Sequence, residues 1–209
     1  MSSAQTKTSP LDFVFPEKLK AHVVEVGASP SIHGFDAFRD LGENFDASER
    51  LLITLTGEEP LQNAAALMRR LLAAFSPRGV DEAPAHAGTV TRLFCASGEN
   101  TMTNVLLALG AQANAVADWV LNEGTLAIDL SEAARWFLEA DFIVDKSDTK
   151  DAREVFKEAF LLCGLQQPWQ VATVWMQAAL PCVVAESMST TFMDFENYPM
   201  NLPKVVLAK

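Results

Sequence analysis

Apolar residues recur every three or four positions along most of the chain, which is the spacing of one buried face of an α-helix. The pattern is clearest after Glu58, Glu59 and Pro60, residue types that are favoured at the start of a helix. The apolar stripe that follows consists of Leu61, Ala64, Ala65, Met68, Leu71, Leu72 and Phe75. It predicts an amphipathic helix that ends before Pro77.

Three further stretches in the second half of the chain show the same spacing. Ser97 can cap a helix that ends near Gly124, and another helix covers roughly residues 130–143. A third helix is predicted to open at Asp148 and to end at Gly164. These elements predict a mainly α protein.

The last helix begins at Pro168 and is apolar nearly all round from residue 169 to residue 185. The polar or helix-bending interruptions are Gln170, Thr173, Gln177 and Pro181. The run is short for a bilayer and lacks flanking basic anchors, which argues against a membrane span. We therefore interpret it as a buried central helix, kinked at Pro181.

The first third of the chain is harder to interpret. Residues 11–26 fit a short strand as well as a helical turn, and residues 47–56 carry a helix-capping Ser48 but end in a β-prone run. We favour a helix over 47–56 and leave a small β element open near the N-terminus. Apolar residues at positions 35, 38 and 41 predict a short helix that closes near Gly42.

Residues 76–88 hold two prolines and two glycines, which marks them as a loop and a candidate mobile segment. The polar residues 1–10 are expected to form a disordered tail. Taken together, the pattern predicts a single-domain helical bundle over residues 11–209, built around the central apolar helix.

Composition narrows the function classes without naming one. The 209 residues are 49% hydrophobic and carry a net charge of -11, with Lys+Arg 16 against Asp+Glu 27. This excludes wholesale disorder and argues against binding to nucleic acid, which requires basic side chains for the phosphates. The three cysteines form no CxxC pair and the N-terminus lacks the order of a secretory signal, so we expect a cytoplasmic protein with reduced thiols.

Groups that could carry catalysis are sparse. The three histidines are isolated from other ligands in the sequence, and phosphate-binding glycine patterns are missing, so neither a metal nor a cofactor is predicted. The strongest enzymatic alternative is a small-molecule enzyme or ligand-binding protein with a pocket near Cys95, Ser97 and His86. The apolar neighbours of Cys95 favour a packed core thiol instead.

The leading hypothesis is a non-catalytic protein-interaction module, such as an adaptor, chaperone, immunity or assembly subunit. Residues 118–148 contain eight acidic residues against Arg135 and Lys146. We expect this acidic helical face to bind another protein with a basic surface. The candidate partner-binding residues are Trp119, Glu132, Trp136, Glu139 and Asp141. The competing interpretation is that the charges only keep the protein soluble, and self-association into a homo-oligomer stays open.

Overall fold

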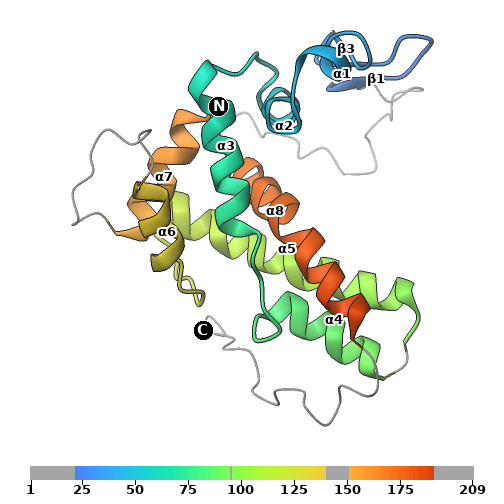
Figure 1. Cartoon of the computed structure of the whole chain (residues 1–209), viewed down its shortest axis with the longest axis vertical. Helices are drawn as coiled ribbons and strands as arrows, with labels where there is room; N and C mark the ends of the chain where they lie inside the picture. Colours follow the sequence, from blue (N-terminus) through green and yellow to red (C-terminus); the bar gives the residue numbers. More distant parts are fainter. Residues whose placement is uncertain (1–21, 95, 140–150, 191–209) are drawn as a thin grey trace, which may run out of the picture.

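The computed structural model describes residues 22–94, 96–139 and 151–190, which form a bundle of helices with a small antiparallel sheet near the N-terminus (Figure 1). The strands are β1 (Val24–Glu25), β2 (Ser31–Ile32) and β3 (Phe35–Asp36). The helices are α1 (Leu41–Asn44), α2 (Ala47–Thr56), α3 (Gln62–Phe75), α4 (Ala83–Leu93), α5 (Gly98–Asn122), α6 (Ser131–Leu138), α7 (Ala152–Leu162) and α8 (Pro168–Ser189). The predicted mainly α class is confirmed.

The three strands pair in the order β1-β2-β3, with Ile32 opposite both Val24 and Phe35. His33 and Gly34 join β2 to β3 with φ angles of 51° and 88°, the positive values that a two-residue type I′ hairpin turn needs. This turn draws Phe35 into the sheet. The helix predicted from positions 35, 38 and 41 is therefore wrong, and Phe38 is 69% exposed.

The open question over residues 47–56 is resolved as a helix, α2. Its cap is Asp46 rather than the predicted Ser48: the Asp46 carboxylate accepts from the backbone N–H groups of Ser48 and Glu49, at 2.7 and 2.9 Å. Glu49 accepts in return from the Asp46 N–H at 2.7 Å, which completes a capping box. The bond from the Glu49 N–H is the main reason that the pKa of Asp46 lies below its ordinary value. The stabilisation from this carboxylate is therefore present at neutral pH and is lost as the pH falls through that lowered pKa.

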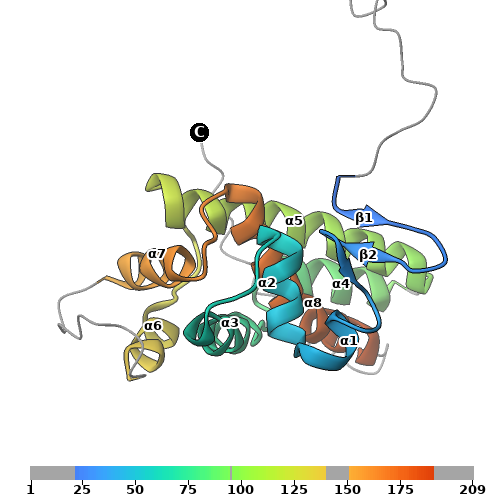
Figure 2. The same ribbon diagram turned by 90° about the horizontal axis from the view of Figure 1, so that it is seen from above.

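Helices α5 and α8 run through the middle of the bundle, with α3 on one side and α4 on the other (Figures 1 and 2). Helix α8 begins at Pro168 as predicted and continues through Pro181. Its fully buried Trp175 lies with its ring centroid 4.9 Å from that of Phe75 on α3, and Phe75 lies 4.9 Å from Phe156 on α7. This aromatic contact joins three helices at the centre of the core.

Among the described helices, α8 is the one whose length and apolar composition would allow it to cross a membrane. In this structure 44% of its most apolar stretch is buried by packing inside the protein, where α8 contacts α3, α4 and α5. A core helix surrounded by other helices has the same composition. The arrangement matches the predicted central helix.

The loop predicted over residues 76–88 is shorter than expected, because residues 83–88 form the first turns of α4. Pro84 lies in the first turn, where a missing N–H costs nothing, and Pro84, Ala85 and Gly88 are buried. A Cβ atom on Gly88 would lie 2.5 Å from Val105 Cγ2 on α5 and 2.7 Å from Ser187 Cβ on α8. The small residues that resembled a loop in the sequence are the ones that let α4 approach its two neighbours closely.

The connection over residues 76–82 is held by a buried polar network. Arg78 Nη1 donates to both carboxylate oxygens of Glu82, at 3.0 and 3.3 Å, and its guanidinium lies 4.8 Å from the centre of the Trp175 ring. Gln112 on α5 donates to Glu82 at 3.0 Å and accepts from Trp175 Nε1 at 3.3 Å. Burial raises the pKa of Glu82 above its ordinary value, although Arg78 and Gln112 oppose the shift. The folded state therefore binds a proton at Glu82 more readily than the unfolded state does. As the pH falls through that raised pKa, the contribution of Glu82 to the free energy of unfolding rises.

Removing one member of this ion pair should lower the free energy of unfolding more than removing both members. Glu82→Leu leaves the Arg78 side chain, which is only 6% exposed, without its carboxylate, and we expect a loss of about 3–5 kcal/mol in the free energy of unfolding. The double variant Arg78→Met with Glu82→Leu should lose less than Glu82→Leu alone. Urea denaturation followed by circular dichroism measures the free energies of unfolding of the unmodified protein, Arg78→Met, Glu82→Leu and the double variant. Losses that simply add would contradict a coupled pair.

Glycine-to-alanine substitutions should have opposite effects at two helical positions. Gly88→Ala places a methyl group against α5 and α8, and we expect the protein to lose about 1–3 kcal/mol by overpacking. The matched control is Gly110→Ala on α5, where the new Cβ meets nothing within 4 Å and alanine favours the helix by up to about 1 kcal/mol. Thermal denaturation compares the two. A stabilising Gly88→Ala would contradict the close approach of the three helices.

Candidate functional site

The acidic segment predicted as a partner-binding surface lies at one end of the bundle, where α5 ends and α6 and α7 begin. Trp119, near the end of α5, is partly buried against the core, with its ring centroid 6.5 Å from that of Phe156. Glu123 closes α5 in the left-handed conformation, at φ 63°. Its carboxylate lies 3.2 Å from Nη1 of Arg153 on α7. The end of α5 is thus fixed both by apolar packing and by an ion pair.

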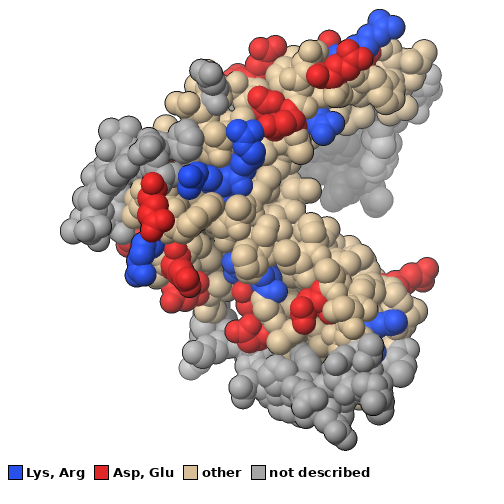
Figure 3. Space-filling model, viewed as in Figure 1, with Lys and Arg blue, Asp and Glu red and all other residues tan. Residues whose placement is uncertain are grey.

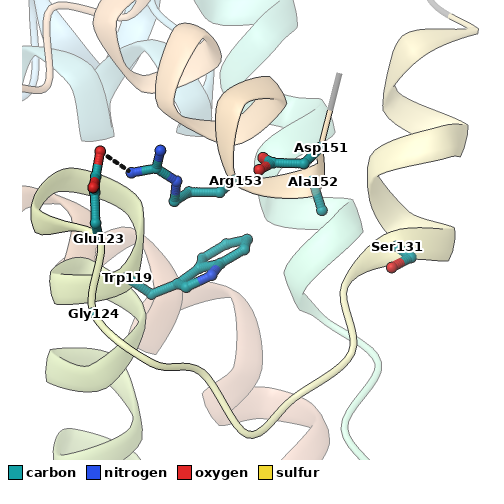
Figure 4. Close-up of a pocket in the computed structure, with 7 residues that line it drawn as sticks. All are labelled: Trp119, Glu123, Gly124, Ser131, Asp151, Ala152 and Arg153. Carbon is teal, nitrogen blue, oxygen red and sulfur yellow. Dashed lines mark ion pairs between the residues drawn. The ribbon is translucent and has the colours of Figure 1, made fainter. Parts of the chain in front are cut away.

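A cavity of about 490 Å³ opens between these three helix ends. In Figure 4 the Arg153 guanidinium from α7 reaches toward Glu123, the Trp119 ring from α5 lies below it, and Ser131 at the start of α6 lies across the space. Asp151 also lines the cavity, but its carboxylate accepts from the Glu154 N–H at 2.9 Å and so caps α7. The cavity therefore offers an indole face and a guanidinium already paired with Glu123. Within the described residues no group of His, Cys, Asp and Glu side chains could hold a metal ion.

The remaining predicted residues lie on α6 or beyond it. Trp136 is 40% exposed, and the guanidinium of Arg70 on α3 lies 5.1 Å from the centre of its ring. Glu132 and Glu139 are exposed, whereas Asp141 lies outside the described residues. Trp136 does not line the cavity beside Trp119. The structure therefore brings the two tryptophans to the same end of the bundle but not into one groove.

Sequence reasoning missed the basic residues at this end, Arg70 and Arg153. Arg70 on α3 lies over Trp136, which is 66 residues away in the sequence, and Arg153 on α7 pairs with Glu123, which is 30 residues away. Only folding brings these residues together. The apolar spacing of α3 places Arg70 outside the buried face of that helix, but nothing in the sequence indicates that it lies over the Trp136 ring. Figure 3 shows basic side chains lying beside acidic ones over α3 and α6. The surface is acidic with basic residues between the acids, rather than uniformly acidic.

The alternative site near Cys95, Ser97 and His86 gains no support from the geometry. The Ser97 hydroxyl accepts from the Asn100 N–H at 3.3 Å and caps α5, as predicted. His86 lies on α4 and is partly buried. Ser97 and His86 line neither the cavity beside Trp119 nor the groove beside Leu61, Leu161 and Leu162. Cys95 lies outside the described residues.

The two described cysteines differ in their surroundings. Cys163 is buried at the end of α7, where its thiol donates to the Ala64 carbonyl oxygen at 3.6 Å, and burial raises its pKa to about 12. Cys182 is exposed on α8. Because the thiolate is the reactive form, Cys163 is protected both by burial and by protonation.

A thiol-reactive probe should therefore distinguish the two side chains. We expect iodoacetamide to label Cys182 in the native protein at pH 8 and to label Cys163 only after unfolding in urea. Mass spectrometry of the labelled peptides gives the extent of modification at each position. Native labelling of Cys163 as fast as that of Cys182 would show that the end of α7 opens readily.

No protein-family model matches this chain, and no curated protein or solved structure is detectably similar to it. Its function has to be inferred from its own residues.

Proposed function

We propose that this chain is a non-catalytic protein-interaction module, an adaptor or assembly subunit, that binds a partner with a basic surface through the exposed face of α6. The supporting observation is the spacing of Glu132, Trp136 and Glu139. These residues lie four and three positions apart, which places them along one face of a helix. All three are exposed, so this acid–tryptophan–acid stripe faces solvent.

The opposite face of α6 explains why the stripe is held outward. Ala134 and Phe137 are buried in the core, and the ring centroid of Phe137 lies 5.8 Å from that of Phe156 on α7. Rotating α6 about its axis would expose Phe137, which would cost about 2–3 kcal/mol of hydrophobic burial. The stripe is therefore presented by a fixed helix, which reduces the entropy lost on binding.

The chemistry of the stripe suits a basic protein surface. A half-exposed tryptophan supplies a large rigid contact of the kind that dominates binding energy, while flanking carboxylates steer a positively charged partner. Arg70 over the Trp136 ring holds the indole in place and leaves 40% of the residue accessible. The predicted residues Trp119 and Asp141 belong to the same proposal: Trp119 lines the cavity that borders α6, and Asp141 lies outside the described residues.

Charge reversal should test this function directly. A partner isolated by affinity capture and mass spectrometry would be purified and its association rate measured by biolayer interferometry. Glu132→Lys with Glu139→Lys should slow association by roughly tenfold or more at low salt, because steering depends on these charges. The rate for the unmodified protein should fall as salt rises from about 0.1 M to about 1 M, where the screening length shrinks from about 10 Å to about 3 Å. Trp136→Ala should mainly speed dissociation.

A matched control reverses two exposed glutamates elsewhere, Glu43→Lys on α1 and Glu186→Lys near the end of α8. This variant changes the net charge equally and should retain at least half of the association rate. Thermal stability should be nearly unchanged in both reversal variants, since all four side chains are exposed. Equal slowing by the two double reversals would assign the effect to net charge and contradict a site on α6.

A further inference from the structure

A second surface feature lies at the opposite end of α7 from the Trp119 cavity. Here the connection between α2 and α3 and the end of α7 enclose a groove of about 340 Å³. We call it the leucine groove, after Leu61, Leu161 and Leu162, which line it together with Ala64, Glu58 and Glu59. Because α7 has 11 residues, the groove and the Trp119 cavity lie about 16 Å apart along this helix.

The leucines of the groove are exposed to an unusual degree. Leu61 is 77% exposed, Leu161 45% and Leu162 48%. By contrast, Phe156 and Phe160 on the other face of α7 are fully buried, so this helix has apolar side chains on both its core side and its solvent side. Exposed apolar side chains that gather in one depression, rather than singly, make this groove a candidate surface for binding another molecule.

Two polar side chains that line the groove, Gln170 and Thr56, are already hydrogen-bonded within the protein. Gln170 donates to the Leu55 carbonyl oxygen at 2.8 Å and accepts from the Gln166 and Gln167 N–H groups. The Thr56 hydroxyl donates to the Leu52 carbonyl oxygen at 2.8 Å. A ligand in the groove therefore contacts the apolar side chains of Leu61, Leu161 and Leu162, and it would have to compete with these internal hydrogen bonds for the Gln170 amide and the Thr56 hydroxyl.

Two acidic side chains at the edge of the leucine groove provide a second feature that a binding partner can recognise. Glu58 and Glu59 are exposed, and within the described residues their carboxylates form no hydrogen bond or ion pair. No basic side chain is among the described residues that line the groove. An occupant with Lys or Arg beside its apolar part would pair with these carboxylates without a competing cation from the described residues that line the groove.

The size of the groove decides between kinds of occupant. Small-molecule sites usually measure about 300–1,000 Å³ and bury most of their ligand. At about 340 Å³ the groove is at the low end of that range and has room for one or two side chains. This favours a segment of another chain, which inserts its apolar side chains and keeps its backbone outside.

We propose that the leucine groove binds a peptide segment of another protein that carries one or two large apolar side chains flanked by Lys or Arg. This site is separate from the exposed face of α6 and goes beyond the function proposed above. The apolar side chains would contact Leu61, Leu161 and Leu162, and the flanking cations would pair with Glu58 and Glu59.

Three synthetic peptides labelled with fluorescein test the proposal on the full-length protein. The probe has two leucines with two lysines on each side; the second peptide has glutamates in place of the lysines, and the third has serines in place of the leucines. Fluorescence polarisation at about 0.1 M salt gives the dissociation constants. We expect saturable binding of the probe, with a dissociation constant at least tenfold lower than for either comparison peptide.

Variants of the protein locate the binding. Leu162→Ser should weaken probe binding at least fivefold by removing an apolar wall, and Glu58→Gln with Glu59→Gln should weaken it at least threefold and reduce its salt dependence. Leu107→Ser, at a 69% exposed leucine on α5, is the matched apolar control. The double reversal Glu132→Lys with Glu139→Lys is the control for the α6 surface. Both controls should bind the probe within twofold of the unmodified protein, and circular dichroism would verify that every variant is folded.

The proposal is overturned by the absence of saturable binding up to 1 mM, by equal affinity for the three peptides, or by binding that Leu162→Ser leaves intact. Loss of binding in the α6 reversal alone would assign the probe to the α6 surface, against this proposal. Analytical ultracentrifugation of the unmodified protein and of Leu162→Ser measures self-association. Self-association that Leu162→Ser abolishes, without probe binding, would make a second copy of this chain the occupant.

Discussion

The buried ion pair between Arg78 and Glu82 is the interaction on which the arrangement of the bundle depends most. Placing two charges away from water costs several kcal/mol per ion, and that cost is offset only if the remaining donors and acceptors are satisfied. Here Gln112 bonds to Glu82 and to Trp175, and Arg78 stacks on the Trp175 ring and donates to the Phe75 carbonyl oxygen. Any other alignment of α4, α5 and α8 would leave one of these groups unpaired. The network thus supports the same register that the close packing of Gly88 against α5 and α8 requires.

The helices of the second half could be predicted because their signals are local. Ser97, Gly164 and Pro168 mark helix ends through their own backbone and side-chain preferences, and all three do so in the structure. The predictions that the structure contradicts failed for a different reason. The first turns of α4 resembled a loop because the reason for small residues there is contact with Val105 and Ser187, far away in sequence.

The candidate sites were less predictable than the fold for the same reason. The acidic residues and tryptophans of residues 118–148 could be found from composition, but Arg70 and Arg153 reach that end of the bundle from other helices. The leucine groove could not be anticipated, because Leu61 continues the spacing of the buried stripe of α3. It is exposed since it occupies the capping position just before the helix, with an extended backbone at ψ 150°. Periodicity describes a helix interior and does not apply to the residue at its end.

The attachment of the sheet to the bundle involves His33. Its Nε2 lies 3.1 Å from the Thr54 carbonyl oxygen on α2, and a Cβ atom on Gly57 would lie 3.2 Å from its Nδ1. The same residue occupies the tight turn between β2 and β3. His33 thus serves both features, with its backbone in the hairpin turn and its imidazole against α2, whereas the helices are joined by broad apolar contact. The sheet should therefore open without unfolding of the helical bundle. Amide hydrogens of the strands then exchange with solvent through this local opening, while those of the helices stay protected.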